Sequence, residues 1–203
     1  MQQNQPLKGV APSAADGFSQ ANSVPSDEYT IGSSDTRGWG SYIATGVERD
    51  ATNNVVACEK RITVNAVSAD PAKVGLLSLQ SHDERDELWR VESGELTVIL
   101  NDQKYTLSAG EEIVIPVKAL HAMANLGNVP AVVFERQTGA KLDNGRTGVC
   151  RESDIHRYCD ALGRATEPVT GAAGEASLAV YRRVMADLQM IQQAMAGPAH
   201  KNS

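Results

Sequence analysis

Residues 79–89 read LQSHDERDELW, a β-type run that stops at a short charged turn and then resumes. Alternate side chains of a strand share one face, so we expect Gln80 and His82 to point the same way. Glu87 opens the next predicted strand, which returns beside the first through the turn. An amide, an imidazole and a carboxylate are therefore expected on one face of a two-stranded unit.

A later polar run extends this pattern. Residues 116–121 read PVKALH and place a second histidine at the mouth of a later strand. Two imidazoles, one carboxylate and one amide oxygen suit Zn²⁺, Fe²⁺, Mn²⁺ or a similar divalent ion. Either histidine alone would be an ordinary surface residue, so the hypothesis of a metal site depends on the joint spacing. The four candidate ligands are Gln80, His82, Glu87 and His121.

Further short β-type runs lie on both sides of this segment. Turn residues such as the Asn101–Asp102 pair separate the runs at regular intervals. Many short strands with turns between them are typical of an all-β sandwich or barrel. The predicted runs are residues 55–57, 61–64, 76–80, 88–91, 96–100, 105–107, 113–115 and 131–134.

The two ends of the chain differ from its middle. Residues 1–34 are rich in Gln, Ser, Ala, Pro and Asn and are predicted to form a flexible N-terminal arm before a barrel at 35–164. The remaining segment, 165–203, begins with a linker composition at 165–174. Apolar residues at helical intervals then predict a helix over 175–195.

Composition excludes some classes of protein. Lys and Arg number 19 against 25 Asp and Glu, a net charge of −6 that argues against non-specific nucleic-acid binding. No run approaches the roughly 20 apolar residues of a membrane helix, and no apolar signal segment is present near the start. The three cysteines are an odd number without zinc-type spacing, so we expect free thiols in a cytoplasmic protein.

The spacing of these motifs resembles that of the cupin superfamily. The pattern Gln80-x-His82-x₄-Glu87-x₆-Gly94 is similar to its first motif, with Gln in place of the usual first His. The second motif is matched by Gly110, Pro116, His121 and Asn125. Lys118 stands where the family has a glycine.

Within the cupins, the chain is similar to the mannose-6-phosphate isomerase domain of the type II family, over about residues 35–164. Matching segments are RGWG at 37–40, KRITV at 60–64, LSLQSH at 77–82, RDELW at 85–89, ERQTG at 135–139 and DIHRYCD at 154–160. The chain departs from the family in its acidic turn at 83–86, in Leu88 in place of a histidine, and in an insertion at 140–153.

The resemblance implies a cupin fold, a double-stranded β-helix or jelly-roll barrel, followed here by the C-terminal α-helix. It also implies a metal-dependent aldose–ketose isomerase of a phosphorylated sugar, of the type that interconverts mannose 6-phosphate and fructose 6-phosphate. One divalent ion would be held by the four candidate ligands, with zinc favoured and Fe, Mn, Co or Ni as alternatives.

Such a reaction moves a proton between C1 and C2, which requires a base and is helped by a Lewis acid. Glu135 is the candidate base, and the other interpretation is that it orients a ligand histidine. Gln137 lies two residues further along the same predicted strand and should face the interior with Glu135. Gln137 and Lys118 are the candidate substrate contacts.

Arginines are the candidates for binding the phosphate, because a guanidinium matches a phosphate bidentately. Arg85, Arg157 and Arg164 are the three candidates. Each could instead form a surface ion pair, and for Arg85, which stands among three acids, that interpretation is favoured.

Two other functions remain open from the sequence. A non-catalytic or regulatory cupin would bind a sugar or small acid through its metal, and the acidic turn and Lys118 would then mark a remodelled pocket. A dioxygenase would hold Fe²⁺ with open positions for O₂. A coupled assay on mannose 6-phosphate, with and without chelator, and an oxygen-uptake assay distinguish the three.

The predicted helix suggests an assembly. Its apolar stripe consists of Leu178, Tyr181, Met185, Leu188, Ile191 and Met195. The stripe either folds back over its own barrel or covers a partner. The linker gives the helix reach, and cupins of the resembled family commonly pair, so we expect a homodimer in which this helix or the arm lies across the neighbouring barrel.

Overall fold

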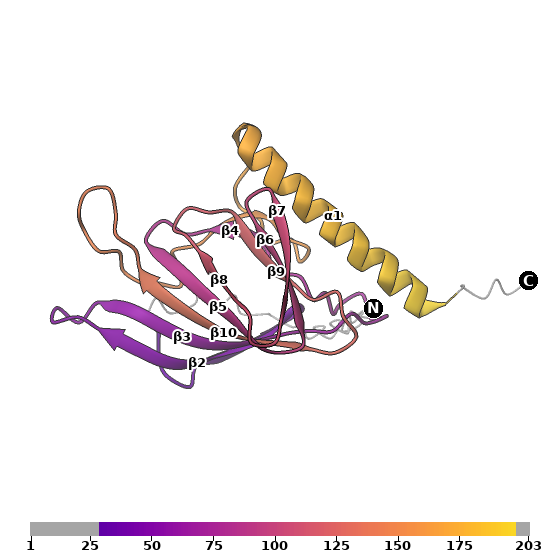
Figure 1. Cartoon of the computed structure of the whole chain (residues 1–203), viewed down its shortest axis with the longest axis horizontal. Coiled ribbons are helices and arrows are strands. Elements are labelled where there is room, and N and C mark those ends of the chain that lie inside the picture. Colours follow the sequence, from indigo (N-terminus) through magenta and orange to yellow (C-terminus); the bar gives the residue numbers. More distant parts are fainter. Residues whose placement is uncertain (1–28, 198–203) are drawn as a thin grey trace, which may run out of the picture.

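The computed structural model describes residues 29–197, so residues 1–28 of the predicted arm lie outside the described residues. Strands and one helix make up the described part (Figure 1). In chain order they are β1 (Ser34–Arg37), β2 (Gly40–Arg49), β3 (Val55–Val64), β4 (Leu79–Ser81), β5 (Arg85–Ser93), β6 (Glu95–Leu100), β7 (Gln103–Ser108), β8 (Glu112–Ile115), β9 (His121–Ala124), β10 (Ala131–Gly139), β11 (His156–Cys159) and α1 (Gly171–Ala196).

Two antiparallel sheets form the barrel. One sheet has the strand order β1-β2-β3-β10-β5-β8, and the other has the order β11-β4-β9-β6-β7. A core that includes Trp39, Trp89, Val98 and Met123 fills the space between them. The predicted fold class, an all-β jelly-roll barrel with a C-terminal helix, is confirmed.

The barrel interior changes character along its length. In β5 the inward side chains are Arg85, Glu87, Trp89 and Val91, so the strand is charged at one end and apolar at the other. Strand β10 runs beside it with the same gradient, because Ala131 and Val133 are inward at one end and Glu135 and Gln137 at the other. The two strands together give the barrel a polar end in which a site can form.

Several strand predictions are confirmed, with changes at their ends. The runs at 55–57 and 61–64 belong to one strand, β3, and the run at 131–134 is the first part of β10. The prediction at 76–80 is only partly correct, because β4 covers Leu79–Ser81 and Leu76 forms an isolated bridge. His82 therefore follows the strand instead of lying within it.

Helix α1 packs on its own barrel, along the outer face of the sheet that contains β6 and β9 (Figure 1). Its buried apolar residues are Leu178, Val180, Tyr181, Val184 and Leu188. They meet Leu79, Ile99, Ala122 and Ala124 of the sheet. The expectation that the helix lies across a neighbouring barrel is wrong. The outer face of this sheet is apolar, and the helix of the same chain shields it from water.

The homodimer itself stays a prediction, and light scattering on the full chain is its test. The helix also begins at Gly171, four residues before the predicted start, within the segment interpreted as a linker.

Cys58, Cys150 and Cys159 are all free, as their odd number predicts, and the first two are buried. Within residues 29–197, no helix has both the length and the apolar character needed to cross a membrane.

The docking of α1 predicts a contrast between two of its residues. Leu188 is 1% exposed and Met190 is 61% exposed. Leu188→Ala should lower the free energy of unfolding by about 2–5 kcal/mol, because it leaves a cavity under the helix. Met190→Ala should change it by less than about 0.5 kcal/mol. Urea unfolding measures both, and equal effects would contradict the docking described here.

Candidate functional site

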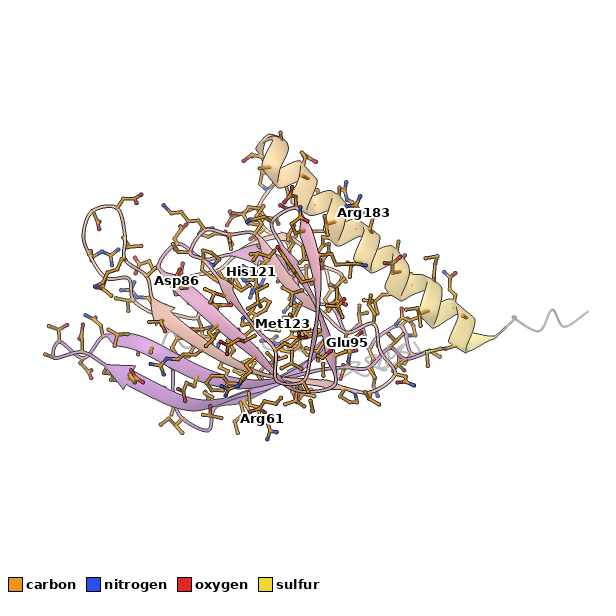
Figure 2. All side chains as sticks on the ribbon, viewed as in Figure 1. Arg61, Asp86, Glu95, His121, Met123 and Arg183 are labelled. Atoms are coloured by element: carbon orange, nitrogen blue, oxygen red, sulfur yellow. The ribbon has the colours of Figure 1, made fainter. Side chains whose placement is uncertain are left out.

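Three of the four candidate ligands meet inside the barrel. The ligand atoms of His82, Glu87 and His121 all lie within 4.8 Å of one another, and the three residues are buried. His82 Nε2 is 3.1 Å from Glu87 Oε1, and His121 Nε2 is 3.7 Å from Glu87 Oε2. Figure 2 shows His121 within the barrel, whereas Arg61 lies on its outside.

Gln80 joins this group from the neighbouring strand. It faces His121 directly across the β4–β9 pair, and its Nε2 lies 3.4 Å from His121 Nε2. Its amide oxygen, the atom that would bind a metal ion, instead accepts a hydrogen bond from Ser78 Oγ at 2.9 Å. A rotation of the amide would be needed to turn this oxygen toward the histidine.

Backbone carbonyls orient both histidines. His82 Nδ1 lies 2.6 Å from the carbonyl oxygen of Asp154, and His121 Nδ1 lies 2.9 Å from that of Ala119. A carbonyl only accepts, so each Nδ1 carries the proton and each Nε2 presents its lone pair. Burial lowers the pKa of His121 to about 4, which keeps this ring neutral.

Glu87 supplies the negative charge between the two rings. Burial alone would raise the pKa of its carboxyl, but the Arg85 guanidinium that donates to it holds that pKa well below its usual value. Trp89 Nε1 also donates to Glu87 Oε2 at 3.1 Å. Imidazole nitrogens beside a carboxylate are the donor set that a borderline divalent ion prefers, so the residues present fit a metal ion.

A cavity of about 600 Å³ opens beside this cluster. Its lining includes Gln80 and Glu87 of the candidate metal centre. Five basic side chains line it, namely Arg37, Lys60, Arg85, Arg157 and Arg164. Three carboxylates line it as well, namely Glu87, Glu135 and Glu152. A chain with net negative charge thus has a cavity in which cations are in excess.

Glu135 and Gln137 reach the cavity from β10, as their alternation predicts. Gln137 Nε2 donates to Glu135 Oε2 at 3.0 Å and to Glu87 Oε1 at 3.3 Å. The hydroxyl of Tyr29 donates to Gln137 Oε1 at 2.7 Å and so fixes the amide orientation. Burial, with the charge of Glu87, raises the pKa of Glu135 to about 8. Within the described residues Glu135 bonds to Gln137 and not to a histidine.

Lys60 also lines the cavity, although it is not among the residues predicted from the sequence. Lys60 is buried and lies opposite Glu135 in the β3–β10 register. Its Nζ pairs with Glu152 and lies 4.8 Å and 4.9 Å from the ring centroids of Tyr29 and Tyr42. A lysine in the middle of a half-buried strand was the available signal, because alternation alone assigns it to the interior.

Arg157 and Arg164 also line the cavity, and Arg157 is the strand partner of Gln80 in the β4–β11 pair. Among the described side chains, Arg157 Nε is the one buried polar atom without a hydrogen-bond partner. Burial and the nearby Arg164 lower the pKa of Arg157. Arg164 pairs with Asp160, and Arg37, which was not predicted from the sequence, pairs with Asp35.

Arg85 is buried, so the favoured interpretation of a surface ion pair is wrong. The pleat of β5 turns Arg85 inward with Glu87. The acids of the turn have other partners: Asp83 pairs with His156, Glu84 pairs with Arg146, and Asp86 accepts the N–H of Val117. Arg85 Nε donates to Glu87 Oε1 at 3.0 Å, and Nη1 donates to the carbonyl oxygens of Arg151 and Asp154.

Lys118, a candidate substrate contact, is exposed in the turn before β9 and is not among the residues that line the cavity. Its backbone N–H donates to the carbonyl oxygen of His82 at 2.7 Å. Its φ of +66° is a conformation that glycine adopts freely, which agrees with the glycine of the cupin motif at this position.

Comparison with known proteins identifies a family likeness over most of the barrel. A family model described as "Mannose-6-phosphate isomerase C-terminal" matches residues 26–157. The alginate biosynthesis protein AlgA of Pseudomonas aeruginosa is 33% identical over 132 residues, which are 65% of this chain and 23% of that protein. The xanthan biosynthesis protein XanB of Xanthomonas campestris is 30% identical over 146 residues, 72% of this chain and 27% of that protein.

A mannose-1-phosphate guanylyltransferase of Escherichia coli is 33% identical over 111 residues, 55% of this chain and 21% of that protein. The chain thus spans about a quarter of the length of these relatives. Among solved structures, the capsular polysaccharide assembling protein CapF of Staphylococcus aureus is similar at 16% identity and a TM-score of 0.46, over 64% of this chain and 34% of that one. An RmlC-like cupin of Shewanella frigidimarina is similar at 14% identity and a TM-score of 0.42, over 54% of this chain and 85% of that one.

The buried Glu135 predicts a pH-dependent stability of the chelator-treated protein. Its pKa is raised from 4.5 to about 8, so the folded chain binds the proton more tightly than the unfolded chain. The free energy of unfolding should therefore fall as pH rises through this window. Glu135→Gln removes this pH dependence. The free energy of unfolding of the variant should therefore rise, relative to that of the unsubstituted protein, as the pH goes from 5 to 9.

Thermal unfolding at both pH values measures this gain, and the exposed Glu95 provides the control. Glu95→Gln should show the same difference from the unsubstituted protein at both pH values. If Glu135→Gln also differed from the unsubstituted protein by the same amount at pH 5 and pH 9, the pKa of Glu135 would not be raised in the folded chain.

Proposed function

The chain belongs to the mannose-6-phosphate isomerase C-terminal family, and on that premise we propose that it is a metal-dependent aldose–ketose isomerase of a phosphorylated sugar. The substrate pair is of the mannose 6-phosphate and fructose 6-phosphate type. The observation that carries the proposal is one cavity lined by Glu87 of the candidate metal centre, the buried acid Glu135 and four arginines. A sugar phosphate has groups that match each of these: vicinal oxygens, an acidic C–H and a dianion.

Gln80, His82, Glu87 and His121 would hold one divalent ion, for which zinc is the first candidate and Fe, Mn, Co or Ni the alternatives. When bound, the ion supplies Lewis-acid stabilisation of the oxygens that become negative. The carbonyls of Asp154 and Ala119 keep both imidazoles turned toward this position.

Glu135 is the proposed general base for the proton on C1 or C2. A base works best when its pKa is near the working pH, and burial raises that of Glu135 to about 8. The bond from Gln137 Nε2 holds one carboxylate oxygen, which limits the rotation of the group. Gln137 is also a proposed substrate contact, since its amide lines the same cavity.

Arg157 and Arg164 are the proposed phosphate-binding residues, with Arg37 beside them in the lining. Arg157 keeps a buried N–H without an acceptor, and its pKa is lowered by burial and by Arg164. A phosphate would satisfy that donor and offset the repulsion between the two cations. The four contacts of Arg85 leave it less suited to this task.

The metal centre predicts a loss of metal without a loss of fold. His82→Ala or His121→Ala should abolish stoichiometric metal, because each removes one ligand of a four-ligand site. His156→Ala is the matched control, since that ring pairs with Asp83 and Glu167 away from the centre. Elemental analysis of the purified proteins, with circular dichroism as a check of the fold, measures both. Full metal occupancy in His82→Ala and His121→Ala would show that the ligand assignment is wrong.

The isomerase activity has a direct test in a coupled assay on mannose 6-phosphate, with and without chelator. Glu135→Gln should lower kcat by about 10²–10⁴-fold, the usual range for a lost general base. Arg157→Gln should mainly raise KM. If the metal-loaded protein binds the sugar phosphate and turns none over, a non-catalytic binding cupin is supported instead, and oxygen uptake with Fe²⁺ would point to a dioxygenase.

A further inference from the structure

The guanidinium of Arg85 lies against two of the candidate metal ligands. Its Nε donates to Glu87 Oε1 at 3.0 Å, and its Nη2 lies 3.2 Å from His82 Nε2. Its Nη1 donates to the carbonyl oxygens of Arg151 and Asp154, each at 2.8 Å. The side chain is buried, so these contacts hold the fork in one orientation without competition from water.

The contact between Arg85 and His82 determines which nitrogen of the imidazole ring carries the proton. A guanidinium keeps its protons, so Nε2 of His82 accepts the N–H of Arg85 through its lone pair. The ring proton lies on Nδ1, which faces the carbonyl oxygen of Asp154 at 2.6 Å. An imidazole nitrogen has one lone pair, and a metal ion at this centre would need the same one.

The distance between His82 Nε2 and Glu87 Oε1 explains why a positively charged group lies beside these two atoms. His82 Nε2 and Glu87 Oε1 are both acceptors in this arrangement, and they lie 3.1 Å apart. Two buried acceptors at this separation repel each other unless a positive group lies against both. Arg85 is such a group, because Nε reaches one atom and Nη2 the other.

We propose that Arg85 is a built-in cation that competes with the metal ion for His82 and Glu87. The inference rests on the metal site proposed above and adds how that site is regulated. An ion that binds His82 Nε2 would replace the contact between that nitrogen and Nη2 of Arg85, so the guanidinium would have to move away from His82. Arg85 therefore keeps the ligands together in the absence of an ion and lowers their affinity for it.

A purely supporting role for Arg85 has the opposite consequence. If the arginine only orients Glu87, its removal weakens metal binding, as the loss of a group that positions a ligand does, by about 10–100-fold. The sign of the change in metal affinity therefore distinguishes competition from support.

The experiment measures Zn²⁺ affinity of the full chain against a chelator of known affinity. Arg85→Met keeps a side chain of similar length but removes every hydrogen-bond donor. This variant should bind Zn²⁺ at least about tenfold more tightly than the unsubstituted protein. Arg85→Lys keeps the positive charge but lacks the planar guanidinium. Its Zn²⁺ affinity should lie between those of Arg85→Met and the unsubstituted protein. Arg37→Met is the matched control, since it removes a cation of the same cavity that does not contact a candidate ligand.

Each outcome is decisive. A gain in Arg85→Met that is absent in Arg37→Met supports competition. An equal gain in both variants, or a loss of affinity in Arg85→Met, overturns it. Failure of all proteins to bind Zn²⁺, Fe²⁺, Mn²⁺, Co²⁺ or Ni²⁺ overturns the metal site and the inference with it, whereas binding by the unsubstituted protein without the gain overturns the inference alone.

A second measurement covers the case in which Arg85→Met does not fold. The Nε–H resonance of Arg85 in the unsubstituted protein, assigned by its absence in Arg85→Lys, is followed during a Zn²⁺ titration. Competition predicts a large shift and faster exchange with water as Zn²⁺ binds. An unchanged resonance at saturating Zn²⁺ overturns the proposal.

Discussion

A carboxylate buried inside a barrel costs free energy unless it is neutralised and fully hydrogen-bonded, and Glu87 is that carboxylate here. Its two oxygens are surrounded by His82, Arg85, Gln137, Trp89 and His121. Most of these come from β5 and β10, whose inward faces change from apolar to polar at the same level. The alternation of two neighbouring strands therefore places both the charge and the groups that satisfy it.

The acidic turn that separates this chain from the usual family pattern has a structural use. Glu84 pairs with Arg146 and accepts the N–H of Val149, and Asp83 pairs with His156. In return, the Asp154 carboxylate accepts the N–H groups of Asp83 and Glu84. The turn and the insertion at 140–153 thus hold each other. Through this pairing the insertion supplies Glu152 and the Arg151 carbonyl to the site.

The barrel strands and the inward side chains of β10 could be predicted from the sequence because both depend on short-range patterns. Short β-type runs between turns identified β3, β6 and β10, and alternation turned Glu135 and Gln137 inward correctly. Partners from distant segments could not be inferred in this way. The contact of Tyr29 with Gln137 spans 108 positions, and the contact of Arg85 with the Asp154 carbonyl spans 69. The docking of α1 was missed for the same reason, since the alanines that receive it are unremarkable in the sequence.

Strand β9 has four residues, and its two faces contact the barrel interior on one side and helix α1 on the other. His121 and Met123 face the interior, while Ala122 and Ala124 belong to the cluster under α1. The methyl groups of these alanines let the helix approach the back of the strand that carries a candidate ligand. The region of family likeness stops at residue 157, before the helix begins. A fragment cut at residue 157 would therefore remove α1 and expose the outer side of the strand that carries His121.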